Sequence, residues 1–244
     1  MNNQKGLTIP NNRGKGLLSL ANLETGGLSM NNFDSRYFNQ LVIFVLDGSG
    51  SMTFGGETGR SKGEEVDSVI KTVIDRLATS KNKDCFDVEA YAFARDYGLM
   101  LSRKRPVDIS RESDFNPVNY VGDYTATLLE ESLTTIQKRI DTYLENPPTP
   151  GVLTKAIVVL LSDGIVHDFA EALTAVNKLK MDNRITVSSI YFHSTEIDDD
   201  DAAEAQEMMR QLSSTELLYS TTTQPEDIRD HMIMSIESAA NVKF

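Results

Sequence analysis

Asp47, Ser49 and Ser51 place one carboxylate and two hydroxyls at alternate positions, directly after an apolar run at 41–46. The two glycines between them leave the backbone free to turn, so that the three side chains can converge. Their oxygen atoms are hard ligands with little total negative charge, and Mg²⁺ or Mn²⁺ bound by such atoms usually keeps waters or takes a further ligand. The pattern therefore predicts a site for a hard divalent ion with an open coordination position.

The apolar run 41–46 is the element that must position these residues. Its six residues, several of them β-branched, are too few for a buried helix and suit a strand that is covered on both faces. A helical pattern begins at Lys62, so the polar residues lie in a strand-to-helix crossover. In an open α/β sheet, ligands bind at the edge where such crossovers leave the strands.

A second apolar run, 156–161, ends in the same way, at Ser162, Asp163 and Gly164. A single aspartate after a strand is ordinarily a helix cap. Two buried parallel strands that both end in an aspartate are expected to lie side by side where the strand order reverses. We therefore expect Asp47 and Asp163 to face one crevice.

A third polar loop holds Thr125 and Thr127, just before a helical pattern with apolar positions from Leu129 to Leu144. Both threonines are expected to lie where a loop meets a helix N-terminus. A threonine there is ordinarily an N-cap. Lying between two aspartates that share a crevice, it is also a candidate for the same site.

The rest of the chain alternates between helical and strand patterns. We expect helices at 66–77, 129–144, 169–179 and 205–212 and after Pro225, and strands at 86–94, 98–102, 185–192 and 217–219. The strands 86–94 and 98–102 are expected to form a hairpin at the sheet edge. The glycine-rich loop 52–61 matches neither G-x-x-x-x-G-K-[ST] nor G-x-G-x-x-G, so nucleotide binding is only an alternative here.

Length and composition favour one large domain with a tail. The 244 residues suit a polar, Gly/Asn-rich arm at 1–38 and a single α/β domain at 39–244. The net charge of −12 argues against nucleic acid or an anionic membrane as the main partner. Cys85 is the single cysteine, so no internal disulfide forms. With no signal-peptide core and no apolar run of membrane-spanning length, we expect a cytoplasmic location.

The Asp47-Gly-Ser49-Gly-Ser51 segment after a hydrophobic strand resembles the D-x-S-x-S motif of von Willebrand factor A (VWA) domains. Thr127, with leucines two and six residues later, resembles the family's T-x-L-x-x-x-[LI] pattern, and Asp163 matches its distal aspartate. Thr125 is the alternative if the loop is shifted. The resemblance covers roughly residues 39–240 and all five positions of the metal-ion-dependent adhesion site.

This resemblance implies a doubly wound, mostly parallel six-stranded sheet flanked by helices, with Mg²⁺ (or Mn²⁺ or Ca²⁺) at its C-terminal edge. Ser49, Ser51 and Thr127 would bind the ion directly, and Asp47 and Asp163 would bind it directly or through water. A glutamate or aspartate of a partner protein would take the open position. The implied function is divalent-cation-dependent protein–protein interaction without catalysis.

Within the family, the lack of disulfides, signal and anchor makes the chain look more like the intracellular bacterial VWA proteins. These include the tellurite-resistance-associated, stress-response type, which often acts with AAA+ ATPases, kinases or phosphatases. By analogy, we expect an adaptor in a cytoplasmic multi-protein complex, with neither nucleic acid nor membrane as its partner.

The alternative is an Mg²⁺-dependent phosphoryl-transfer enzyme, whose nucleophile is also an aspartate at a strand end. Haloacid-dehalogenase-like phosphatases have a second acidic residue two positions on and a lysine further along. Here Ser49 holds the acidic position, and no lysine is expected at the crevice. His167 is expected to be a surface residue, and the other two histidines lack companions at metal-ligand spacing.

Overall fold

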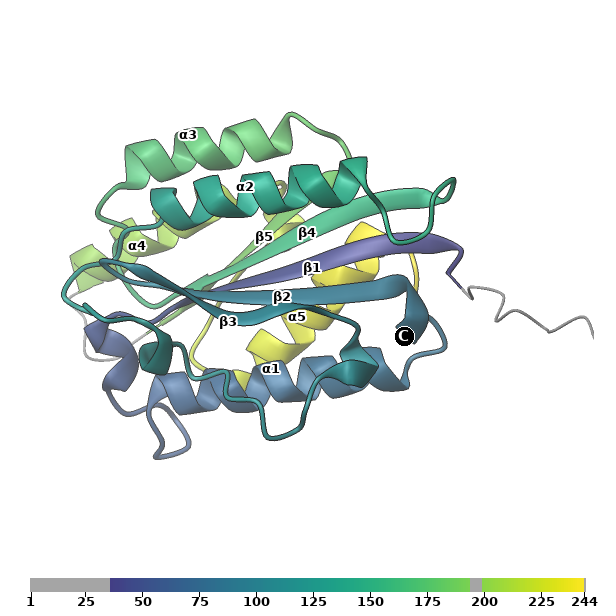
Figure 1. Cartoon of the computed structure of the whole chain (residues 1–244). Coiled ribbons are helices and arrows are strands. Elements are labelled where there is room, and N and C mark those ends of the chain that lie inside the picture. The colour runs from purple at the N-terminus through teal and green to yellow at the C-terminus, as the bar shows by residue number, and fades with distance from the viewer. Residues whose placement is uncertain (1–35, 194–198, 244) are drawn as a thin grey trace, which may run out of the picture. The chain divides into compact units, whose positions relative to one another are not determined.

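A six-stranded sheet forms the centre of the computed structural model, which describes residues 36–193 and 199–243 (Figure 1). The strands lie in the order β3-β2-β1-β4-β5-β6. Their bounds are Phe38–Asp47 (β1), Phe86–Phe93 (β2), Tyr97–Lys104 (β3), Leu153–Ser162 (β4), Ile185–Phe192 (β5) and Tyr219–Thr222 (β6). In this part of the chain β3 pairs antiparallel with β2, and the other pairs are parallel. The predicted fold class and the edge hairpin are confirmed.

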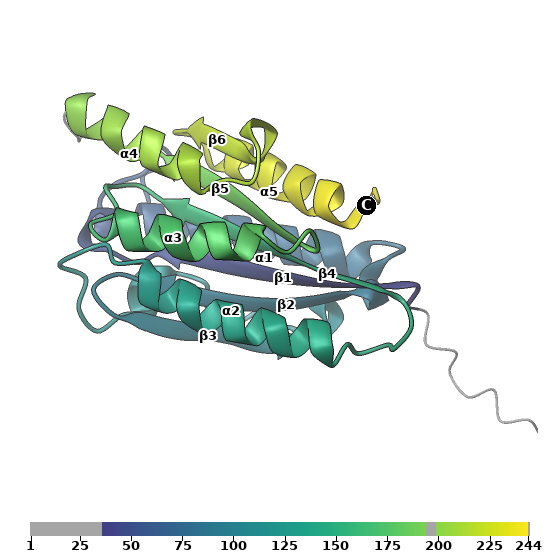
Figure 2. The same cartoon turned by 90° about the horizontal axis from the view of Figure 1, so that it is seen from above.

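Helices cover both faces of the sheet (Figures 1 and 2). They are α1 (Lys62–Thr79), α2 (Glu130–Glu145), α3 (Phe169–Lys180), α4 (Asp199–Leu212) and α5 (Pro225–Ala240). One core lies between the sheet and α1 and α5, and the other lies between the sheet and α2, α3 and α4. Successive β1 residues alternate between them, with Phe44 in the first core and Ile43 and Val45 in the second.

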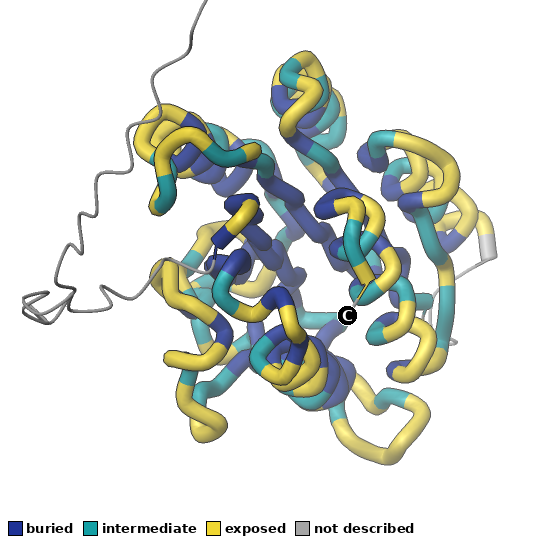
Figure 3. The backbone as a smooth tube through the Cα atoms, turned by 90° about the vertical axis from the view of Figure 1, so that its right-hand side faces the viewer, coloured by how far each residue is buried: buried dark blue, intermediate teal, exposed yellow. Residues whose placement is uncertain are grey.

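The burial of β1 explains why its sequence is apolar without alternation. All ten of its residues are buried, and so are the last seven of β4. Figure 3 shows these strands in dark blue between helices whose outer turns are exposed. Burial of a side chain such as Phe44 contributes about 1.5–3 kcal/mol of hydrophobic stabilisation. The prediction of strands covered on both faces is confirmed.

The strand order reverses between β1 and β4. From β1 the chain passes to β2 on one side, and β4 later adds to the other side of β1. In the parallel pairing Leu46 lies opposite Leu161, so β1 and β4 end at the same edge, at Asp47 and Ser162. This is the topological switch point at which α/β sheets bind their ligands.

The two edge strands are short or irregular. The last strand begins at Tyr219, later than the predicted 217–219, because 216–218 form a 3₁₀ turn in which Leu218 N donates to Thr215 O at 3.0 Å. At the opposite edge, the β2–β3 pairing shifts register twice, between Val88 and Tyr91.

Residues 1–35 of the predicted arm, 1–38, lie outside the described residues. The described chain begins at Arg36, whose guanidinium bonds to the Asp87 carboxylate of β2 at 2.7 Å, with both side chains buried. Phe38 is already the first residue of β1 and belongs to the core beneath α1 and α5.

Candidate metal-binding site

Three of the predicted site residues lie at the end of β1 and in the loop that follows it, and neighbouring segments hold the backbone of this loop. Gly48 N donates to Phe93 O at 2.8 Å, and Gly50 N donates to Tyr124 O at 2.9 Å. A Cβ atom on Gly48 would lie 2.8 Å from the Pro117 carbonyl oxygen, so this close approach requires glycine. Neither Gly48 nor Gly50 has a positive φ. Gly48 is needed for its small size, and not for the freedom to turn that the sequence suggested.

Side-chain oxygens from the ends of β1 and β4 converge at this edge. Ser49 Oγ lies 3.1 Å from Ser51 Oγ, and Ser51 Oγ donates to Asp163 Oδ1 at 2.6 Å. Asp47 joins the group through two further bonds: its Oδ1 accepts from Ser49 N at 2.8 Å, and its Oδ2 accepts from Ser162 Oγ at 2.5 Å. Four of the five predicted residues therefore lie in one hydrogen-bonded group, and Ser162 joins them.

The two carboxylates of this group are both fully buried. Burial, and then the negative charge of Asp163, raise the pKa of Asp47 from 3.8 to about 7. Two like charges at a dry strand edge are costly, and a divalent cation between them would remove that cost. Together with the serine hydroxyls, they form the kind of hard oxygen set that fits Mg²⁺ or Mn²⁺.

A lysine also lies at the crevice, so the expectation that none does is wrong. Lys62 Nζ lies 2.6 Å from Asp163 Oδ2, and the two side chains are 3% and 0% exposed. The glycine-rich loop returns Lys62 to the sheet edge, where Lys62 N donates to Phe54 O at 3.0 Å. A capping box of Ser61 and Glu64 then starts α1 at this point. In the sequence, the only indication that Lys62 lies at the crevice was that the helical pattern after the loop begins at this residue.

Thr127 and Thr125 differ in their surroundings. Thr127 is buried, whereas Thr125 is exposed and its hydroxyl donates to Asp123 Oδ1 at 2.5 Å. The backbone of Thr127 bonds to His167 on both sides: Thr127 N donates to His167 Nδ1 at 3.1 Å, and Thr127 O accepts from His167 N at 2.9 Å. These contacts place the backbone of Thr127 beside the loop that follows Asp163, and the choice of Thr127 as the site residue stays a prediction. His167 is exposed, as expected, but it also holds this loop against the one that follows β4.

Neither threonine caps α2, so the ordinary interpretation of their position is wrong. The N-cap position is Leu129, which has no capping side chain of its own. Asp168 supplies the cap instead, because its carboxylate accepts from Leu129 N at 2.9 Å and from Glu130 N at 2.8 Å. The segment after Asp163 thus fixes both Thr127 and the start of α2.

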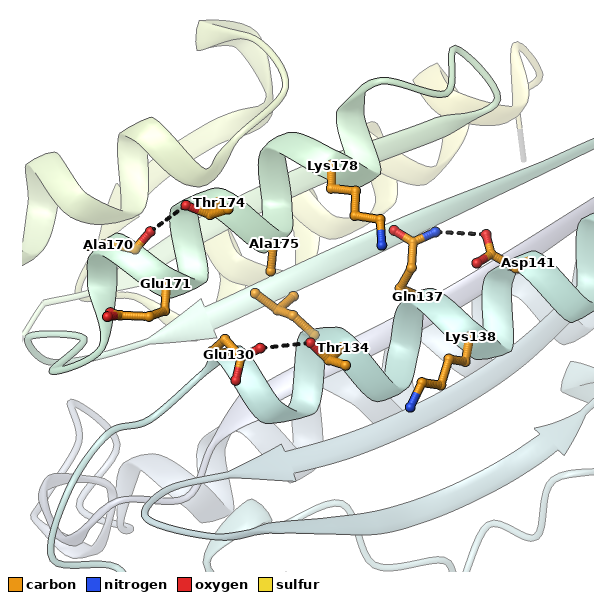
Figure 4. Close-up of a pocket in the computed structure, with 11 residues that line it drawn as sticks. Glu130, Thr134, Gln137, Lys138, Asp141, Ala170, Glu171, Thr174, Ala175 and Lys178 are labelled. Atoms are coloured by element: carbon orange, nitrogen blue, oxygen red, sulfur yellow. Dashed lines mark hydrogen bonds between the residues drawn. The ribbon is translucent and has the colours of Figure 1, made fainter.

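A hollow of about 570 Å³ lies between α2 and α3, away from the candidate metal site (Figure 4). Two of its side-chain hydrogen bonds run along α2, from Thr134 to Glu130 at 2.8 Å and from Gln137 to Asp141 at 2.7 Å. None of the five predicted site residues lines it. The candidate metal site is therefore separate from this groove. In the described part of the chain, no group of three or more His, Cys, Asp or Glu side chains could hold a metal ion, so the candidate site depends on hydroxyl as well as carboxylate oxygens.

A doubly wound sheet with hydroxyls and carboxylates at its switch point defines a Rossmann-like domain with a candidate metal centre. The family model of the von Willebrand factor type A domain matches residues 42–231. The chain therefore belongs to the VWA family, a class of metal-dependent adhesion and protein-interaction modules. No curated protein sequence matches it significantly.

Solved structures share the fold at low sequence identity. The pilus adhesin SpaC of Lactobacillus rhamnosus GG aligns with TM-score 0.63 and 12% identity over 83% of this chain. Proximal thread matrix protein 1 of the mussel byssus, with a zinc-occupied MIDAS motif, gives 0.57 and 16% over 83%, and manganese-loaded TRAP of Plasmodium vivax gives 0.57 and 17% over 82%. The alignments cover 30%, 46% and 74% of those chains, respectively.

We expect Thr127→Val to weaken Mn²⁺ binding by about 10- to 100-fold. The substitution removes the hydroxyl and keeps the shape of a buried side chain. Thr125→Val is the matched control, and it should leave the affinity unchanged because Thr125 Oγ1 already bonds to Asp123. Isothermal titration calorimetry of both variants measures the difference. A larger loss for Thr125→Val would assign the ligand to the other threonine.

Proposed function

We propose that this domain binds a protein partner through a divalent cation, held by Asp47, Ser49, Ser51, Thr127 and Asp163, to which the partner contributes a glutamate or aspartate. Mg²⁺ is the proposed resident ion, with Mn²⁺ or Ca²⁺ as substitutes. The observation that carries the proposal is the convergence of Ser49, Ser51 and Asp163 oxygens within 3.1 Å of their neighbours at the switch point. When bound, the ion would supply an electrophilic position for a carboxylate.

The surroundings of the site also suit a protein ligand. Ser51 is partly exposed, whereas Ser49 and Asp163 are buried, so a ligand can approach from the Ser51 side. Phe54 and Tyr124, on the two loops joined by the Gly50–Tyr124 backbone bond, are 52% and 55% exposed. Exposed aromatic side chains beside a polar anchor are typical of the residues that dominate protein–protein binding energy.

The first test is quantitative affinity capture followed by mass spectrometry, using the wild-type chain in Mg²⁺ and in EDTA. Proteins that bind through the site should be retained in Mg²⁺ and lost in EDTA, and Ser49→Ala should lose the same proteins in Mg²⁺. Ser102→Ala is the control, because Ser102 is exposed on the edge strand β3. Equal capture under all these conditions would contradict the proposal.

Lys62 supplies one feature of the alternative function, because a phosphoryl-transfer site uses a lysine beside its aspartate. The lysine, however, pairs with Asp163, and both oxygens of the buried Asp47 already accept hydrogen bonds. A carboxylate held in this way is a poor nucleophile. We therefore expect no hydrolysis of a generic phosphatase substrate in Mg²⁺; turnover that Asp47→Asn abolishes would support the enzyme.

We further propose a cytoplasmic adaptor role in a multi-protein complex, with an AAA+ ATPase, a kinase or a phosphatase as candidate partner. The resemblance to intracellular bacterial stress-response VWA proteins supports this, together with the single cysteine, which is buried and unpaired. None of the helices in the described residues is long and apolar enough to cross a membrane. Cell fractionation tests the location directly.

A further inference from the structure

Lys62 gives the site a positive charge of its own. Asp47 and Asp163 contribute two negative charges when ionised, and the Lys62 ammonium contributes one positive charge, 2.6 Å from Asp163. All three side chains are at most 3% exposed, so water screens their interactions poorly. The ammonium also lies 5.9 Å from the centre of the Phe192 ring, which is buried beside it.

We propose that Lys62 is a built-in counter-ion that competes with the divalent cation for Asp163. An incoming ion must either displace the ammonium from the carboxylate or bind beside it, and both routes weaken metal binding. The proposal rests on the proposed function, since it assigns the charge balance of the same site.

The geometry leaves room for displacement. Lys62 lines a hollow of about 180 Å³ together with Gly55, Gly56, Glu57 and His193. Movement into this space would bring the ammonium toward the Glu57 carboxylate, a group of opposite charge that lines the same hollow. In either position the lysine stays close to the site.

The competition has a consequence for the ligand that the metal can take. With a divalent ion, two ionised aspartates and Lys62, the loaded site carries one net positive charge, whereas without Lys62 it is neutral. The surplus charge favours an anionic ligand, such as the carboxylate of a partner, over a neutral one. Lys62 therefore lowers the affinity for the ion and raises the preference of the bound ion for an acidic residue.

The test compares Mn²⁺ binding by wild type, Lys62→Met and Lys71→Met in titration calorimetry. We expect Lys62→Met to bind Mn²⁺ about tenfold or more tightly, which is about 1.4 kcal/mol. Lys71→Met is the matched control on the same helix, because Lys71 pairs with Asp67 at 2.8 Å and is 36% exposed. It should leave the affinity unchanged.

Thermal unfolding provides a second readout. Lys62→Met should unfold at a lower temperature than wild type in EDTA, because Asp163 loses its cation, and should gain more from added Mn²⁺. If this variant is unfolded in EDTA, the Mn²⁺ concentration that restores its circular dichroism gives the comparison.

The outcomes separate this inference from the proposed function. If wild type binds Mn²⁺ and Lys62→Met binds it no more tightly, the competition is disproved and the proposed function stands. If Lys62→Met alone binds Mn²⁺, the competition is supported and metal-dependent binding by wild type is contradicted. If neither binds, both ideas fail.

Discussion

Asp163→Asn is expected to abolish divalent-ion binding and to lower the free energy of unfolding in EDTA by about 3–5 kcal/mol. The substitution leaves the Lys62 ammonium buried without its carboxylate partner, and an uncompensated buried charge is strongly destabilising. It also removes one of the two negatively charged groups of the candidate site. Urea denaturation in EDTA measures the stability, and calorimetry with Mn²⁺ measures the binding.

The matched control for Asp163→Asn is Asp182→Asn. Asp182 pairs with Arg184 at the same distance, 2.6 Å, but their side chains are 33% and 46% exposed. Because water screens an exposed pair, this substitution should cost less than about 1 kcal/mol. Combining Asp163→Asn with Lys62→Met should recover much of the stability without restoring metal binding. Equal costs for Asp163→Asn and Asp182→Asn would contradict the account of a buried ion pair.

Asp47→Asn is expected to have opposite effects on binding and stability. It should weaken Mn²⁺ binding about 100-fold, because Asp47 contributes charge and orients the Ser49 backbone. In EDTA above pH 7 it should raise the free energy of unfolding by about 2 kcal/mol, because the cost of burying the Asp47 charge and its repulsion from Asp163 both disappear. The asparagine oxygen can still accept from Ser49 N, and its amide can donate to Ser162 Oγ, which has Gly164 O as a further acceptor at 3.3 Å.

The stabilising effect of Asp47→Asn should depend on pH. The pKa of Asp47 is raised in the folded protein, so its contribution to stability is full below about pH 3.8 and is lost as the pH rises through about 7. The stability difference between Asp47→Asn and wild type should therefore grow from pH 4 to pH 8 in EDTA. Saturating Mn²⁺ should reverse the order of the two proteins. A difference that does not change with pH would show that Asp47 is not under electrostatic strain.

The sequence predicted the sheet and the strand ends well because both depend on local pattern. The unbroken apolar runs 41–46 and 156–161 correspond to buried strands, and their paired aspartates indicated which strands would be neighbours. The leucines after Thr127 favoured it over Thr125, and this choice stays a prediction; the contact of the Thr127 backbone with His167, forty positions away in the chain, could not be predicted from local pattern.

Lys62 escaped prediction for a similar reason. A lysine in the first turn of a helix is normally a solvated residue, and nothing in its neighbours indicates a buried partner. Its pairing with Asp163 spans 101 positions and depends on how the loop after Ser51 returns to the sheet edge. Long-range ion pairs of this kind are set by tertiary structure, which a single sequence does not encode in any local motif.

The two borders of the sheet limit how another chain could join it. β6 offers four residues for pairing, and β3 combines an irregular register with the charged side chains of Arg103 and Lys104. Short, twisted or charged borders resist the addition of a foreign strand and so guard against aggregation. Recognition of this domain by β-strand augmentation is accordingly disfavoured, which agrees with the proposal that a partner binds at the loops at the carboxyl ends of the strands.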